Sequence, residues 1–187
     1  MIIGITGTNG AGKGTVVDYL VKEKGFTHYS VREAITEEIL RRGLPVNRTN
    51  LNEVATDLRR LHGPAYYAEL FMERAQKGGV TDAIIESIRN PKEAEYIQAH
   101  GGVMLVVDAD KHVRYERIQK RASETDRVSF EEFEKQEQRE MVSENPSDPS
   151  YMNISAIFEM ADSHVRNDGT REELHAQVEE VLRKVGA

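Results

Sequence analysis

Short apolar runs recur along the chain, and stretches with helical spacing of apolar residues fill the intervals between them. The runs at 1–6 and 102–109, "MIIGIT" and "GVMLVVDA", are nearly unbroken. Unbroken apolar runs of this length are typical of strands that are buried on both faces of a parallel sheet. With three weaker runs, the predicted strands are 1–6, 26–30, 82–87, 102–109 and 162–167.

Capping residues, glycine and proline mark the helix boundaries. Asn90 followed by Pro91 is typical of a helix start, "SFEE" and "TREE" have the form of capping boxes, and "HGP" separates two helices. The predicted helices are 13–24, 32–43, 50–61, 66–76, 90–101, 111–121, 129–142, a short helix between 152 and 162, and 170–184. The alternation predicts one doubly wound α/β domain over 1–187, with a parallel five-stranded sheet flanked by helices.

Composition narrows the classes of protein that fit this architecture. Hydrophobic residues make up 39% and charged residues 30% of the 187 residues, which is ordinary for a soluble domain. No apolar stretch approaches the roughly 18 residues that span a bilayer, and the apolar N-terminal run lacks the basic segment of a signal peptide. We therefore expect no membrane partner. The absence of cysteine excludes disulfides, thiolate metal sites and cysteine nucleophiles, and it favours a cytoplasmic setting.

Charge and histidine placement exclude two further classes. The formal net charge of −7 argues against a nucleic-acid partner, because domains that bind nucleic acid usually carry a basic patch. The six histidines are scattered, with no second histidine or carboxylate at ligand spacing in the same element. We therefore expect surface or core roles for the histidines rather than a metal centre.

One stretch, "GTNGAGKGT" at 7–15, has the composition of a phosphate-binding loop. It lies between a predicted strand and a predicted helix, where backbone N–H groups and the helix N-terminus face anionic oxygens. Gly7 and Gly12 allow tight turns, and Lys13 can neutralise charge on the β- and γ-phosphates of ATP. Thr15 can hold Mg²⁺ together with waters and phosphate oxygens. The residues predicted to bind ATP are Gly7, Asn9, Gly10, Ala11, Gly12, Lys13, Gly14 and Thr15. A glycine-rich turn with an incidental lysine is the alternative.

Gly14 stands where the common phosphate-loop pattern has serine or threonine. The form "GxxGxGKGT" nevertheless resembles, position by position, the loop of adenylate kinase and other nucleoside monophosphate kinases. "ESIRNPKEAEYI" at 86–97 and "VVDADKHVRYERIQKR" at 106–121 also resemble small nucleotide kinases, and 161–182 is similar to the C-terminal part of dephospho-CoA kinases as well. The resemblance implies a P-loop NTPase (nucleotide kinase) fold with a short lid, with ATP and Mg²⁺ as cofactors.

The resemblance also implies which residues contact the acceptor. Arg32 stands where these kinases have an arginine for the acceptor's phosphate, and Glu86 resembles their acidic residue that orients Mg²⁺ through water. Arg89 follows the third predicted strand, at the end of an α/β sheet where ligands bind, and its planar guanidinium can grip a phosphate with two N–H groups. The acceptor-binding helical region is expected at about 32–80, of which 44–80 matches no known pattern. The alternatives are a solvated helix position for Arg32 and a salt bridge or helix cap for Glu86.

The lid of such a kinase is expected at about 117–130. Arg117 and Arg121 are four residues apart and therefore share one helix face, and Arg127 follows them. Lids bring such arginines onto the phosphates and exclude water. A solvated face with acidic partners is the alternative. Three other arginines are expected at the surface: Arg59, Arg60 and Arg114.

The turn between the last strand and the final helix is a further candidate. In similar kinases this turn lies beside the adenine of ATP, which makes Asn167 and Gly169 candidate nucleotide-binding residues through their backbone. An ordinary turn between a strand and a helix explains the same residues equally well.

The predicted function is ATP- and Mg²⁺-dependent transfer of the γ-phosphoryl group to a nucleoside or deoxynucleoside monophosphate. Dephospho-CoA kinase is the alternative enzyme, although "YSVREAI" lacks the Asp-Ala-Asp start expected for that family. An ATP-binding switch or assembly factor with weak ATPase activity is the alternative outside the enzymes, and the presence of Arg117 and Arg121 favours an enzyme. The base, the sugar and the oligomeric state are left open by the sequence.

Overall fold

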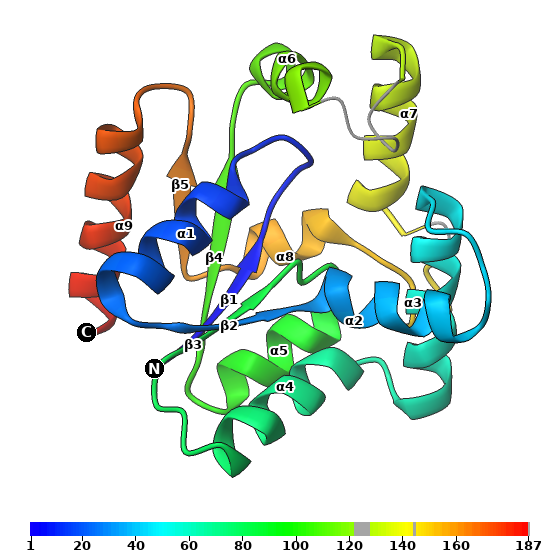
Figure 1. The fold of residues 1–187 in the computed structure, drawn as a ribbon, viewed down its shortest axis with the longest axis horizontal. Coiled ribbons are helices and arrows are strands. Elements are labelled where there is room, and N and C mark those ends of the chain that lie inside the picture. Colours follow the sequence, from blue (N-terminus) through cyan, green and yellow to red (C-terminus); the bar gives the residue numbers. More distant parts are fainter. Residues whose placement is uncertain (122–127, 144, 187) are drawn as a thin grey trace.

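Parallel strands form the centre of the computed structural model, which describes residues 1–121, 128–143 and 145–186 (Figure 1). The strands are β1 (Ile2–Thr6), β2 (Thr27–Ser30), β3 (Ala83–Glu86), β4 (Val103–Asp108) and β5 (Ser163–Arg166). Within the described residues they form one five-stranded sheet in the order β2-β3-β1-β4-β5. Ile5 of β1 lies in register with Glu86 of β3 on one side and Leu105 of β4 on the other. The carboxyl ends of the strands therefore meet along one edge, with β1 in the middle.

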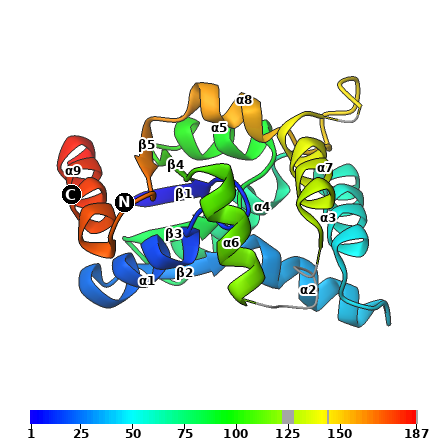
Figure 2. The ribbon, with the colours of Figure 1, turned by 90° about the horizontal axis from the view of Figure 1, so that it is seen from above.

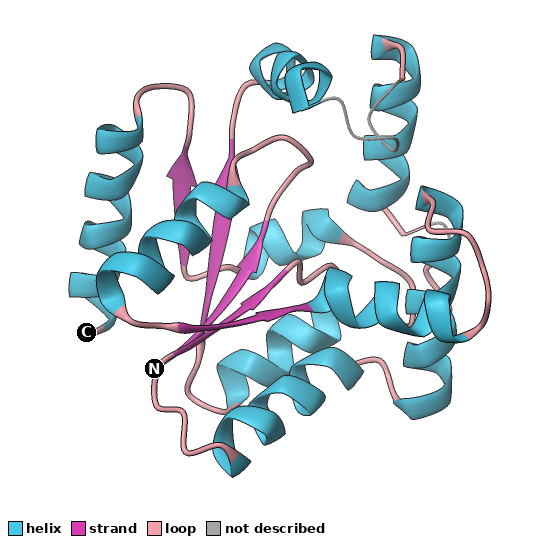
Figure 3. Ribbon diagram, viewed as in Figure 1, coloured by secondary structure: helices cyan, strands magenta, loops and turns pink. Residues whose placement is uncertain are grey.

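Helices cover both faces of this sheet (Figure 3). They are α1 (Lys13–Lys24), α2 (Val31–Arg41), α3 (Arg48–His62), α4 (Tyr66–Lys77), α5 (Pro91–Ala99), α6 (Lys111–Arg121), α7 (Phe130–Met141), α8 (Ile154–Met160) and α9 (Arg171–Val185). α1 and α9 lie on one side of the sheet, and α5 and α8 lie on the other (Figure 2). α3 and α7 lie together at the end of the molecule far from α9 (Figures 1 and 2).

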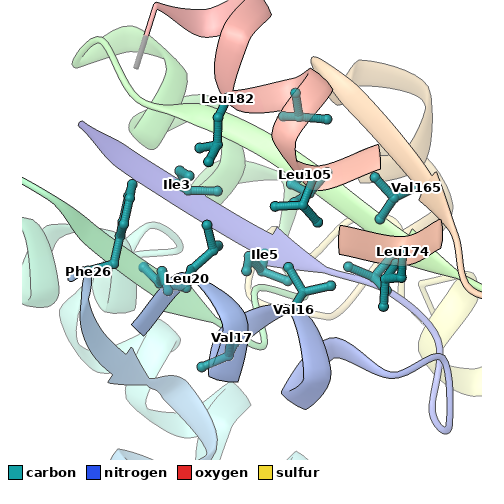
Figure 4. Close-up of a cluster of buried hydrophobic side chains, with 14 of the residues drawn as sticks. Ile3, Ile5, Val16, Val17, Leu20, Phe26, Leu105, Val165, Leu174 and Leu182 are labelled. Atoms are coloured by element: carbon teal, nitrogen blue, oxygen red, sulfur yellow. The ribbon is translucent and has the colours of Figure 1, made fainter. Parts of the chain in front are cut away.

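Alternating side chains of the strands supply a separate core to each face. Ile5 and Leu105 pack with α1 and α9 (Figure 4), whereas Ile85 and Met104 pack with α2, α3, α4, α5 and α8. Successive residues of a strand point to opposite faces, so a strand that is apolar at every position is buried on both sides. The unbroken apolar runs of the sequence are explained by this double coverage.

The predicted fold class is confirmed, and the helix caps explain where its boundaries differ. The side chain of Asn47 accepts a hydrogen bond from the Asn50 N–H at 2.9 Å, which begins α3 two residues before the predicted start at 50. Ser30 caps α2 in the same way, and Thr170 forms the predicted capping box of α9. No helix among the described residues is long and apolar enough to cross a membrane.

Candidate active site

The loop between β1 and α1 has backbone angles that glycine adopts more readily than other residues. Gly7 has φ +145°, and a Cβ there would lie 2.0 Å from the Val107 carbonyl oxygen. Gly12 has φ +95°, and a Cβ there would lie 2.0 Å from the Asn167 side-chain amide. Both positions therefore require glycine, for conformation and for space. The loop is held tightly against β4 and against the turn after β5.

Lys13 is folded back over this loop. Its Nζ donates hydrogen bonds to the carbonyl oxygens of Gly7 (3.0 Å) and Thr8 (2.9 Å). Burial and the nearby positive charge of Arg89 lower the pKa of Lys13 to about 8. The carboxylate of Glu86 acts in the opposite direction. A bound anion would stabilise the protonated form of Lys13 and raise this pKa.

A cavity of about 720 Å³ opens in front of the loop, and most of the predicted site residues line it. The predicted residues in its wall are Asn9, Gly10, Gly12, Lys13, Gly14, Thr15, Arg32, Glu86, Arg89, Arg117 and Arg121. A cavity of this size suits a small organic ligand. Gly7, Ala11, Asn167 and Gly169 do not line it. Arg127 lies, with the rest of 122–127 in the middle of the predicted lid, outside the described residues.

Asn167 and Gly169 stabilise the loop and a helix cap in the structure. The buried Asn167 side chain donates to the Ala11 carbonyl oxygen at 2.8 Å, and its backbone N–H donates to the Asp108 carbonyl oxygen at 2.8 Å. A Cβ at Gly169 would lie 1.9 Å from a carboxylate oxygen of Glu173, which completes the capping box of α9. Asn167 therefore connects the end of β5 to the loop between β1 and α1.

The chain turns sharply where β3 ends, directly beside Lys13. Ser87 has φ +73°, a left-handed conformation that is uncommon for residues other than glycine. Its hydroxyl donates to Glu86 at 2.6 Å, and His28 Nε2 lies 3.9 Å from the other Glu86 oxygen. The turn places Glu86, Ser87 and Arg89 in the wall of one cavity.

Glu140 of α7 is a cavity residue that sequence analysis missed. Its carboxylate accepts hydrogen bonds from Arg48 at 2.7 Å and from Arg89, and the Glu140 side chain is buried. Burial alone would raise the pKa of Glu140, but the guanidinium groups of Arg89 and Arg48 outweigh it and lower the pKa to about 2. Arg89, which was predicted to bind a phosphate, is therefore paired in the structure with the carboxylate of Glu140.

α6 lies close over the phosphate-binding loop. A Cβ at Gly10 would lie 2.5 Å from the Arg114 carbonyl oxygen, so glycine at this position lets the helix approach. Arg121 Nη2 lies 3.4 Å from Asn9 Oδ1, which it donates to, and Nη1 of Arg117 is buried with no hydrogen-bond partner among the described residues. α6 thus brings two of the predicted lid arginines to the cavity.

Two of the three arginines expected at the surface are buried, and that prediction was wrong. Arg114 donates to the Ala109 carbonyl oxygen at 2.9 Å and forms an ion pair with Glu137 of α7. Arg59 is 1% exposed and forms an ion pair with Glu93 of α5. Arg60 is exposed, as predicted. No local signal in the sequence distinguishes Arg59 and Arg114 from exposed arginines. The carboxylates that pair with them in the interior, Glu93 and Glu137, come from other helices.

Comparison with known proteins assigns the chain to a family. The sequence profile described as "AAA domain" matches residues 3–142, which contain the loop, β3, α6 and all of α7. The chain belongs to the AAA domain family. This AAA domain protein is 28% identical over 191 residues to the UPF0200 protein TK1334 of Thermococcus kodakarensis, covering 99% of this chain and 98% of that protein.

Solved structures show the same fold. TT1252 from Thermus thermophilus is 24% identical with a TM-score of 0.56, covering 100% of this chain and 98% of that one. Shikimate kinase from Aquifex aeolicus is 18% identical with a TM-score of 0.56, covering 98% and 96%. The AAA domain protein therefore has the fold of P-loop kinases. This class of proteins is broader than the nucleoside monophosphate kinases that its loop resembles.

Proposed function

We propose that this AAA domain protein transfers the γ-phosphoryl group of ATP, with Mg²⁺, to a nucleoside or deoxynucleoside monophosphate. The observation that carries the proposal is the convergence of Lys13 and six arginines on one cavity, the arginines being Arg32, Arg48, Arg59, Arg89, Arg117 and Arg121. Phosphoryl transfer is accelerated mainly by positioning and by positive charge around the transferring group. A nucleotide-binding switch needs the loop and the lysine, but it has no need of this many cations.

The donor half of the cavity has the groups that ATP and Mg²⁺ need. The loop supplies backbone N–H groups at the start of α1, and Lys13 supplies a cation beside them. Thr15 and Glu86 both line the cavity and offer oxygen ligands, directly or through water, which is the ligand chemistry of Mg²⁺. When bound, Mg²⁺ would neutralise charge on the β- and γ-phosphates.

The acceptor half is built around Arg89 and Arg48, which share the carboxylate of Glu140. A phosphate presents the same kind of oxygen pair as a carboxylate, with more charge. The phosphate of the acceptor would therefore take the place of Glu140 on Arg89. Arg117 and Arg121 approach from the side of the loop and would stabilise charge on the transferring group.

The proposal predicts ATP-dependent turnover of a monophosphate acceptor. A coupled ADP-release assay should be run over the common ribo- and deoxyribonucleoside monophosphates and dephospho-CoA, with wild type and Lys13→Ala. We expect ADP release to rise at least tenfold over the acceptor-free rate with one or more monophosphates, and to fall to background in Lys13→Ala. Turnover of dephospho-CoA alone would move the assignment to that kinase. A slow rate that no acceptor changes would favour an ATP-binding switch.

A further inference from the structure

One face of α3 lines the cavity, in the region of the sequence that matches no known pattern. Its residues are Arg48, Leu51, Asn52, Ala55 and Arg59, at the three- and four-residue spacing of a single helix face. Arg48, at the start of the face, shares the carboxylate of Glu140 with Arg89. Arg59, at the far end, forms a separate ion pair with Glu93. The two ends of this face therefore differ in charge.

Arg59 and Glu93 form a neutral pair that leaves one guanidinium nitrogen unpaired among the described residues. Arg59 Nε and Nη2 lie 2.7 Å and 3.3 Å from the two carboxylate oxygens of Glu93, whose side chain is 0% exposed. The guanidinium also lies over the Tyr67 ring, 5.1 Å from its centroid. Within the described part of the chain, Arg59 Nη1 has no hydrogen-bond partner, although Arg59 lines the cavity. A buried donor without a partner is costly, so a ligand oxygen that reached Nη1 would relieve that cost.

The chemistry of that oxygen follows from the surroundings of Arg59. Because Glu93 already balances the guanidinium charge, the pair offers a hydrogen bond but little net attraction for a second anion. The cavity wall supplied by α2 and α3 also contains the apolar side chains of Val31, Ile35 and Leu51. These side chains would leave the hydroxyl groups of a sugar acid or polyol unpaired. A flat ring with an uncharged carbonyl oxygen suits both features.

We propose that Arg59 is a specificity-determining residue that donates from Nη1 to an exocyclic oxo group on the base of the acceptor. This inference rests on the proposed phosphotransfer to a monophosphate and adds a choice of base to it. An amino group at the same ring position is itself a hydrogen-bond donor, so it could not accept the hydrogen bond from Arg59 Nη1. The site should therefore prefer oxo bases to the matching amino bases.

Two pairs of acceptors test this preference, because each pair exchanges an oxo group for an amino group at one ring position. The pairs are inosine against adenosine monophosphate, and uridine against cytidine monophosphate. In the wild-type protein we expect the oxo member to have the higher kcat/KM, by about tenfold to hundredfold, in the pair whose ring size the cavity accepts. Titration of each acceptor into the protein with a non-hydrolysable ATP analogue should show the same order of affinity.

Variants then assign the preference to Arg59. The double variant Arg59→Met/Glu93→Met removes both charges together and avoids an unpaired buried carboxylate. We expect it to reduce the preference to about twofold or less while keeping the melting-temperature shift with ATP and Mg²⁺. Arg60→Met, on the same helix but outside this cavity, should keep the wild-type preference. Arg59→Lys provides a second test that retains a cation opposite Glu93 and removes the planar fork.

The outcomes separate this inference from the proposed function. Phosphorylation of both members of each pair at equal kcat/KM would overturn the role of Arg59 and leave the phosphotransferase standing. So would a preference that survives in both the double variant and Arg59→Lys. Failure of the wild-type protein to phosphorylate these four acceptors or any other common nucleoside or deoxynucleoside monophosphate, despite a normal ATP shift, would overturn the proposed function itself.

Discussion

At the scale of single residues, the depressed pKa of Lys13 predicts that nucleotide binding depends on pH. Free Lys13 has a pKa of about 8, and bound phosphate stabilises its charged form and raises that pKa. Binding is therefore fully supported below pH 8 and weakens above it, by up to roughly tenfold per pH unit. The phosphates of ATP are already ionised in this range, since their last pKa is about 6.

Calorimetric titration with Mg²⁺ and a non-hydrolysable ATP analogue at pH 7, 8.5 and 9.5 measures this dependence. At pH 8.5, the heats in two buffers of different ionisation enthalpy should reveal proton uptake on binding. Lys13→Arg is the matched control, because a guanidinium keeps its charge throughout this range and should bind without proton uptake. Equal pH dependence in the wild type and Lys13→Arg would show that Lys13 is not the titrating contact.

Residues whose role depends on neighbours in the sequence could be predicted, and residues whose role depends on distant partners could not. The glycines and lysine of 7–15 follow from the local needs of a phosphate-binding loop. Arg59 pairs with a residue 34 positions away, and Glu140 pairs with arginines 51 and 92 positions away. In the sequence, Glu140 is one acidic residue among many on a charged helix. The folded chain alone brings these partners together.

At the scale of elements, Glu140 joins α7 to α3 and to the turn after β3. Its pKa in the folded protein is about 2, below the ordinary 4.5, so its stabilising contribution is present above pH 4.5 and is lost as the pH falls towards 2. Glu140→Gln leaves two arginines without their counter-charge. We expect it to lower the free energy of unfolding at pH 7 by about 3 kcal/mol, with the difference from wild type shrinking below pH 4.5.

Inorganic phosphate distinguishes an anion site from an ordinary structural ion pair. If Arg48 and Arg89 are the acceptor-phosphate site, millimolar phosphate should raise the melting temperature of Glu140→Gln by more than that of wild type. Glu134 lies on the same helix as Glu140 and forms an exposed ion pair with Lys111 of α6. Glu134→Gln is therefore the control and should change stability by less than about 1 kcal/mol. Equal phosphate shifts in all three proteins would contradict an anion site at Arg48 and Arg89.

Element positions were predictable where the chain carries its own boundary signals. Asn90 and Thr170 cap the helices that their sequence context predicts, and the buried strands appear as apolar runs. The packing of α3 along the cavity was not predictable in the same way. Its polar and apolar spacing indicates a helix, but its packing against α2 and α4 decides which of its faces lines the cavity.

At the scale of the whole molecule, the strand order places the lysine loop beside the end of β3, so the proposed donor and acceptor halves share one cavity. This arrangement is the basis of the central claim that the protein moves a phosphoryl group between two bound molecules. Arg89 is the residue that tests it, because it lies in the acceptor half yet close enough to Lys13 to lower the pKa of that lysine.

Steady-state kinetics of Arg89→Ala, with ATP and the acceptor both varied, alongside direct ATP titration, is the most direct measurement. Loss of a charged partner of phosphate should lower kcat/KM for the acceptor by roughly 100-fold to 1,000-fold. ATP affinity should change by less than about threefold, and Arg89→Lys should recover part of the loss. A variant that loses ATP binding and acceptor turnover in parallel would contradict the separate acceptor site on which the account depends.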